Sequence, residues 1–316
     1  MFIPIIFCLL LSFFPLENIH AVGNKDISSS EKNDIVSAEL TEELPGQPAI
    51  TRAEQVMKAL AAAYPRQIDQ VEFRNNDWAV FLRGHWFYFA DGKILREDLI
   101  ANAASFNRHP FYSYPAELPA WKPPTPEQEE RYRNFVKNRT ANPPKRSPLF
   151  FDDLWRIHDR NEALSRMQTF RLFGKNIIVH YLILEELALV EEHILAAGKK
   201  DSKVQKWIDT VDIAETWNWR IIAETQSRSF HSYGLALDFL PKKLEQHSYW
   251  VWTTREREDW WNVPYSERYH PPDAVIKAFE KFGFTWGGKW NEYDTMHFEY
   301  RPEILILNGI SPETRR

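Results

Sequence analysis

The chain has almost no cysteine, and this restricts the kinds of site that it can form. Its 316 residues include a single one, Cys8, which lies inside the first apolar stretch. A mature chain that has lost this stretch can form neither a disulfide nor a thiolate metal site. Any transition-metal site must therefore use His, Asp and Glu side chains.

A strong excess of charge of either sign is also missing. Lys and Arg number 39 against 44 Asp and Glu, which gives a formal net charge of −5. A charge this small gives no electrostatic reason to expect a nucleic-acid partner. Hydrophobic residues make up 44% of the chain, enough for a sizeable core in one large domain or two small ones. We expect a monomer.

Long apolar runs are limited to the N-terminus. Residues 3–15 form an uncharged run that is short for a transmembrane helix but typical of the core of a secretory signal peptide. Cleavage after Ala21 is predicted, which defines residues 1–21 as the signal peptide. The alternative is an uncleaved anchor, because no Lys or Arg precedes the run. Since no other segment is expected to span a membrane, the sequence predicts export to the periplasm or cell envelope.

The first half of the chain divides by composition. Residues 22–48 are polar and acidic, which is typical of a flexible leader. Residues 49–113 predict a small unit with a helix from Arg52 to about Ala63 and a β-hairpin over 78–90. Residues 114–147 are rich in proline and predict a connector around a charged helix near 126–138.

The second half, residues 148–316, alternates short helical and strand patterns. It predicts an α+β fold in which helices flank a small antiparallel sheet. The expected helices cover 161–166, 182–197 and 272–282, and the expected strands cover 168–171, 176–180, 218–223, 236–240 and 297–300, with a strand and turn over 284–290.

Two short runs in this half contain side chains that bind metals. His231 and Asp238 are seven residues apart, in a loop that enters a strand. Asp294 and His297 are three apart, near the start of another strand. Two imidazoles and one carboxylate are enough to hold a zinc ion and leave a fourth position for water, with a second carboxylate to take the water's proton. Taken alone, each run also fits an ordinary turn.

Together the two runs resemble the zinc signature of the D-alanyl-D-alanine carboxypeptidase family and its L-alanyl-D-glutamate endopeptidase branch. This family belongs to the lysostaphin/D-Ala-D-Ala peptidase/hedgehog fold group, and the resemblance covers roughly residues 148–305. The pattern S-x-H-x-x-G-x-A-x-D falls on Ser229, His231, Gly234, Ala236 and Asp238. The pattern W-G-G-x-W…D-x-x-H-F-E falls on Trp286, Gly287, Gly288, Trp290, Asp294, His297, Phe298 and Glu299.

The resemblance implies roles for these residues. His231, Asp238 and His297 would bind one zinc ion per chain, and Asp294 would be the general base. The base is usually Glu in the carboxypeptidase branch, so an Asp here is more typical of the endopeptidases. The scissile bond is therefore either the terminal D-Ala-D-Ala bond or the internal L-Ala-D-Glu bond.

The family also uses an arginine near the scissile carbonyl. Arg220 is our candidate, because it lies just upstream of the first ligand on a predicted strand. Arg171 and Arg228 are rivals, and a plain structural ion pair is an equal alternative. Glu299, two residues after a ligand, is expected either to orient that imidazole or to pair with Arg301.

The sequence thus predicts an exported zinc metallopeptidase that acts on peptidoglycan stem peptides. The alternative is a non-catalytic, zinc-stabilised, hedgehog-like binding module of the cell envelope. Because every candidate ligand lies after residue 200, we expect the N-terminal unit to be dispensable for hydrolysis.

Overall fold

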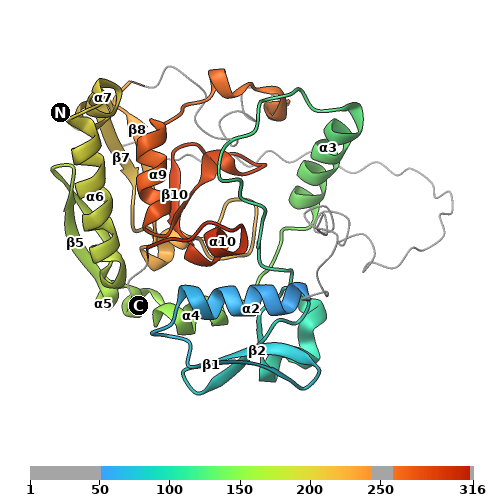
Figure 1. Cartoon of the computed structure of the whole chain (residues 1–316). Coiled ribbons are helices and arrows are strands. Elements are labelled where there is room, and N and C mark those ends of the chain that lie inside the picture. The colour runs from blue at the N-terminus through green and yellow to red at the C-terminus, as the bar shows by residue number, and fades with distance from the viewer. Residues whose placement is uncertain (1–50, 244–258, 314–316) are drawn as a thin grey trace, which may run out of the picture. The chain divides into compact units, whose positions relative to one another are not determined.

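The computed structural model describes residues 51–243 and 259–313 (Figure 1). The predicted signal peptide (1–21) and leader (22–48) lie outside the described residues. Within the described ranges, every helix is too short or too polar to cross a bilayer.

The N-terminal part contains the predicted helix and hairpin. Helix α2 (Arg52–Ala63) starts after Thr51, whose side chain accepts a hydrogen bond from the Glu54 amide. An antiparallel four-stranded sheet follows, with its strands in chain order. The strands are β1 (Gln70–Arg74), β2 (Asp77–Leu82), β3 (His85–Tyr88) and β4 (Leu95–Arg96), and the 3₁₀-helix η2 (Glu97–Ser105) comes next.

The connector contains the predicted charged helix, α3 (Pro126–Ala141). Its first turn is fixed by a capping box, in which Thr125 and Gln128 each bond to the other's backbone amide. None of its residues is fully buried. Helix α3 therefore contributes nothing to the centre of the core, and it contacts the other elements at their surface.

The second half has the α+β architecture that the sequence predicts, with small antiparallel sheets and flanking helices. A four-stranded sheet has the order β7-β8-β10-β9, and β5 pairs with β6 in a separate hairpin. The strands are β5 (Met167–Leu172), β6 (Lys175–His180), β7 (Val211–Glu215), β8 (Ala236–Pro241), β9 (Phe284–Trp286) and β10 (His297–Tyr300). The α-helices are α4 (Leu149–Trp155), α5 (Arg160–Arg166), α6 (Leu184–Gly198), α7 (Ser202–Thr210), α9 (Asp273–Lys281) and α10 (Pro302–Leu307).

One strand prediction, over residues 218–223, is wrong. This segment makes only an isolated bridge between Ile221 and Arg228, and β7 is the edge strand instead. The backbone of the segment bonds to the turn that carries His231 rather than to a strand. The Asn218 amide donates to the His231 carbonyl, and the Arg220 amide donates to the Ser232 hydroxyl.

The two halves share one hydrophobic core. A single cluster of buried side chains includes Val56 and Leu60 of α2 together with Phe279 and Phe298 of the second half. Helix α2 packs against α10, and the two lie side by side in Figure 1. The predicted boundaries of residues 49–113, 114–147 and 148–316 stay a prediction, but the outer two segments pack as one body.

Candidate metal centre

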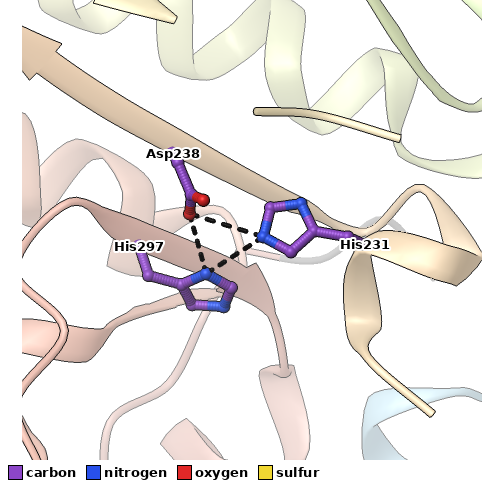
Figure 2. A group of neighbouring side chains, drawn as sticks. All are labelled: His231, Asp238 and His297. Atoms are coloured by element: carbon purple, nitrogen blue, oxygen red, sulfur yellow. Dashed lines mark hydrogen bonds and ion pairs between the residues drawn. The ribbon is translucent and has the colours of Figure 1, made fainter. Parts of the chain in front are cut away.

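Three side chains from three elements converge in the second half (Figure 2). His231 lies in the 3₁₀-turn η4 (Phe230–Tyr233), Asp238 in β8 and His297 at the start of β10. Nε2 of His231 is 3.4 Å from Oδ1 of Asp238 and 3.3 Å from Nδ1 of His297. The latter nitrogen is 2.9 Å from Oδ1 of Asp238. All three residues are buried.

These separations fit a tetrahedral metal ion. Two ligands that each lie about 2.0–2.1 Å from a tetrahedral zinc ion are about 3.3 Å apart. Two of the three donor pairs match this spacing, and the third is a few tenths of an ångström shorter. The donors are two nitrogens and one carboxylate oxygen, a set that suits such an ion. The residues present could therefore hold a metal ion.

The outer nitrogen of each imidazole already has an acceptor. Nδ1 of His231 lies 2.6 Å from the Thr216 carbonyl oxygen, and Nε2 of His297 lies 3.2 Å from Oε2 of Glu299. When these outer nitrogens carry the protons, the lone pairs of the two inner nitrogens, Nε2 of His231 and Nδ1 of His297, point to the shared centre. Glu299 also pairs with Arg301, so both predicted partners of this carboxylate are present.

A glycine shapes the turn that carries the first histidine. Gly234 ends η4 with φ at +68°, in the left-handed region that favours glycine. A Cβ atom there would lie 2.4 Å from the Met167 sulfur and 2.7 Å from the His180 amide nitrogen. The glycine of the first pattern is therefore required both by conformation and by space.

The first glycine of the second pattern lies against the backbone of Asp294. A Cβ atom on Gly287 would lie 2.4 Å from the Asp294 carbonyl oxygen, and one on Gly288 would meet the ring of Trp286 at 2.1 Å. The Asp294 amide donates to the Gly287 carbonyl at 2.9 Å, and the Asp294 carbonyl accepts from the His297 amide at 3.1 Å. Only glycine at position 287 permits this close approach of the two backbones.

The pKa values of the two aspartates, Asp294 and Asp238, are shifted in opposite directions. Burial raises the pKa of the Asp294 carboxyl to about 7, although His297 opposes this. Burial also disfavours the charge on Asp238, but His231 and His297 hold the pKa of its carboxyl below the ordinary value. Oδ1 of Asp294 is buried and has no hydrogen-bond partner among the described residues. One carboxylate thus suits a ligand, and the other suits a base that works near neutral pH.

Of the three candidate arginines, Arg220 is linked to the metal-binding group. Its Nη2 and Nε atoms lie 2.6 Å and 3.1 Å from Oε2 of Glu215, and that oxygen is 3.5 Å from Nε2 of His231. The Arg220 side chain is 37% exposed, so solvent and solutes can reach it. Glu215 lies opposite Asp238 in the sheet. Sequence reasoning missed this residue, because only the pairing of β7 with β8 reveals it.

The rival arginines have other surroundings. Arg228 forms an ion pair with Asp152, donates to the Ile157 carbonyl at 3.1 Å and packs on the ring of Trp219. These contacts are those of a structural anchor. Arg171 lies exposed on β5, in the hairpin outside the four-stranded sheet.

Comparison with known families agrees with this geometry. Residues 223–300 match a family described as D-alanyl-D-alanine carboxypeptidase. The matched region contains His231, Asp238, His297 and Asp294, and it starts just after Arg220. Residues 56–111 match a family described as a domain of unknown function (DUF8518). Comparison with curated proteins and with solved structures gave no match. The match supports a peptidase, over part of the chain.

Proposed function

We propose that this protein is a zinc peptidase that hydrolyses peptide bonds in the stem peptides of peptidoglycan. One observation carries the proposal: His231, Asp238 and His297 meet at the spacing of a tetrahedral metal site, inside the region that matches a peptidase family. These three residues would hold the ion. When bound, zinc supplies a Lewis acid that polarises a carbonyl group and lowers the pKa of water.

Asp294 is the proposed general base. Its carboxylate accepts a proton from the attacking water and then gives it to the leaving amine. A base works best when its pKa lies near the working pH, and burial moves the pKa of Asp294 to about 7. Its unpartnered Oδ1 is the atom that can take the proton.

Arg220 is proposed to stabilise the negative charge that develops on the carbonyl oxygen. A guanidinium has several N–H donors in a rigid plane, so it can bind Glu215 on one side and an oxyanion on another. The bond to Glu215 fixes the direction of the guanidinium before the substrate arrives. Fixed donors of this kind lower the barrier because they need no reorganisation during the reaction.

Asp294 is the residue that bears on which bond is cleaved. An aspartate at this position resembles the endopeptidase branch, which favours the internal L-Ala-D-Glu bond over the terminal D-Ala-D-Ala bond. The proposed site of action is the periplasm or cell envelope, where peptidoglycan lies. Fractionation of cells that express the full chain tests this location.

Digestion of purified peptidoglycan tests the activity and names the bond. Loss of the terminal D-alanine in mass spectra identifies a carboxypeptidase, and release of peptides that begin with D-Glu identifies the endopeptidase. Protein that contains zinc but leaves every stem peptide intact would support the alternative, a zinc-stabilised binding module. Protein that takes up no zinc would overturn the proposal.

A further inference from the structure

We infer that helix α3 is a positioning element that holds the loop of Asp294 in place. The inference rests on the proposed function for the role of Asp294, and on the contacts of α3 for the rest. The helix forms an ion pair with Glu292, and its Tyr132 packs on two tryptophans, one of which contacts Tyr293. Glu292 and Tyr293 are the two residues that precede Asp294. It lies outside both matched regions, 56–111 and 223–300.

The ion pair joins Arg139, in the last turn of α3, to Glu292. Nη1 of Arg139 lies 2.6 Å from Oε2 of Glu292, and the two residues are 153 positions apart in the chain. The side chains are only 13% and 27% exposed, so water screens the pair weakly. Nη2 of Arg139 also donates to the Ala223 carbonyl at 3.3 Å. One guanidinium thus ties the loop of Asp294 to the segment that follows Arg220.

Glu292 is strongly held in this position. Its burial raises the pKa of its carboxyl, and the guanidiniums of Arg139 and Arg146, both from the connector, oppose that effect. A buried carboxylate is costly unless a cation is near, and the connector supplies the cations. The loop and the connector therefore depend on each other electrostatically.

The aromatic cluster makes the second connection. The ring of Tyr132, in the middle of α3, stacks on Trp261 with centroids 5.6 Å apart and an interplanar angle of 16°. Trp260 packs edge-on against Tyr293 at 5.9 Å, and the Tyr293 hydroxyl donates to the Trp260 carbonyl at 3.3 Å. Tyr293 is completely buried. A displacement of α3 would therefore remove support from the residue next to Asp294.

The composition of α3 agrees with this role. The helix has no fully buried residue, so it adds no side chain to the interior of the core. Its contacts reach the 259–262 segment, where Asn262 donates to Glu129 at 3.3 Å, and Glu292. Figure 1 shows α3 on the side of β10 away from α6. The connector thus supports the site from outside the sheet that carries the proposed ligands.

Positioning of this kind matters because general-base catalysis depends on distance. A displacement of about 1 Å at a reacting group costs on the order of 10²-fold in rate. The backbone of Asp294 is held by its bonds to Gly287 and His297. The contacts from α3 add support at the two residues that precede Asp294.

The test compares Arg139→Met with Lys137→Met, a charge removal at an exposed position of the same helix. Zinc-loaded proteins are assayed on peptidoglycan, and amide hydrogen exchange is followed in a peptide that covers residues 290–296. For Arg139→Met we expect faster exchange in this peptide and a kcat roughly 10- to 100-fold lower, with KM and zinc content unchanged. Exchange in β8 should not change. Lys137→Met should behave like the wild type, and Arg139→Lys should restore part of the loss.

A double-mutant cycle and a second position complete the test. Arg139→Met combined with Glu292→Gln should lower kcat no further than Arg139→Met alone, because the two residues act as one pair. Tyr132→Phe keeps the stacked ring and should be neutral, whereas Tyr132→Ala should act like Arg139→Met. Wild-type exchange and kcat in both Arg139→Met and Tyr132→Ala would overturn the inference. If exchange rises as expected but the wild type cleaves no peptidoglycan, the support of the loop by α3 stands and the proposed function fails.

Discussion

Asp238 and His297 lie directly opposite each other on β8 and β10, with Oδ1 of one 2.9 Å from Nδ1 of the other. Opposed residues of an antiparallel pair point to the same face of a sheet. The register of two hydrogen-bonded strands therefore fixes two of the three proposed ligands before any metal binds. His231 joins them from the turn just before β8, so the site rests on rigid backbone.

Removal of either histidine should remove the metal. We expect His231→Ala and His297→Ala to lose the single zinc ion, because two remaining ligands bind too weakly. Elemental analysis of the purified proteins measures this, and a lower melting temperature should accompany the loss. His85→Ala, at an exposed position of β3, is the matched control. Full zinc content in both ligand variants would contradict the assignment.

Asp294→Asn should keep zinc and fold but lose turnover. The amide has nearly the same shape as the carboxylate, yet it cannot accept the proton of the attacking water. Loss of a general base costs on the order of 10²–10⁴ in rate. Metal content and peptidoglycan cleavage are measured on one preparation. Asp294→Glu should retain part of the activity, since it keeps the carboxylate and changes only its reach. Near-normal cleavage by a zinc-loaded Asn variant would rule out Asp294 as the base.

Glu299→Gln should weaken metal binding without removing it. The carboxylate accepts from Nε2 of His297 and so keeps the other nitrogen of that ring directed at the metal. Loss of such a partner typically costs 10- to 100-fold in metal affinity. Titration against a chelator measures the affinity, and activity at saturating zinc should stay close to the wild type. An unchanged affinity would show that Glu299 serves Arg301 alone.

Arg220→Met and Arg228→Met should separate chemistry from stability. We expect Arg220→Met to lower kcat by about 10²-fold with normal zinc content and melting temperature, because it removes a donor for the oxyanion. Arg228→Met should leave Asp152 buried without its cation and cost about 3 kcal/mol of stability, with little effect on kcat of the folded protein. Denaturation curves and steady-state kinetics distinguish the two. The reverse outcome would make Arg228 the substrate arginine.

His180 should make the protein sensitive to mild acid. It is fully buried, it faces the Trp155 carbonyl through Nε2, and its Nδ1 accepts from the Leu182 amide. Burial lowers the pKa of its imidazole to about 4, whereas the unfolded chain has about 6.5. The unfolded state therefore binds a proton first, so this stabilisation is complete above about pH 6.5 and is lost as the pH falls towards 4. We expect about 2 kcal/mol of loss between about pH 7 and 4.5.

The His180→Gln variant is the comparison for this effect. Its free energy of unfolding should fall less steeply over the same pH range, because glutamine does not titrate. Urea denaturation at several pH values gives both slopes. Parallel curves for the two proteins would show that other groups cause the acid sensitivity.

Local patterns in the sequence predicted much of the fold. The two strand patterns on either side of Arg83 and Gly84 predicted the β2–β3 hairpin, and the helix predicted over 272–282 corresponds to α9. The strand placed at 218–223 was wrong because its aromatic and β-branched residues suit a strand, while its backbone groups bond to the turn at His231. Contacts with residues distant in the chain determined the conformation of that segment, and a local sequence pattern does not reveal such contacts.

The candidate site, like the fold, was predicted from the sequence only in part. His231, Asp238 and His297 stand in a spacing that can be read from the chain, and the structure brings them together. Glu215 and Arg139 could not be predicted from the sequence, because each pairs with a residue that is distant in the chain. Glu215 lies near His231, and Arg139 pairs with Glu292. The prediction that the N-terminal unit is dispensable for hydrolysis was based only on the positions of the proposed ligands. Removal of residues before 145 would expose the shared core and take α3 away.

The shared core also governs when this polypeptide can fold during its synthesis. The buried hydroxyl of Tyr64, just after α2, donates to Glu303 of α10, a residue 239 positions later. Because α2 packs on α10 as well as on β2, its buried face is completely covered only after residues 302–307 have been synthesised. The core of this polypeptide is therefore completed late, and contacts between residues so far apart in the sequence slow folding.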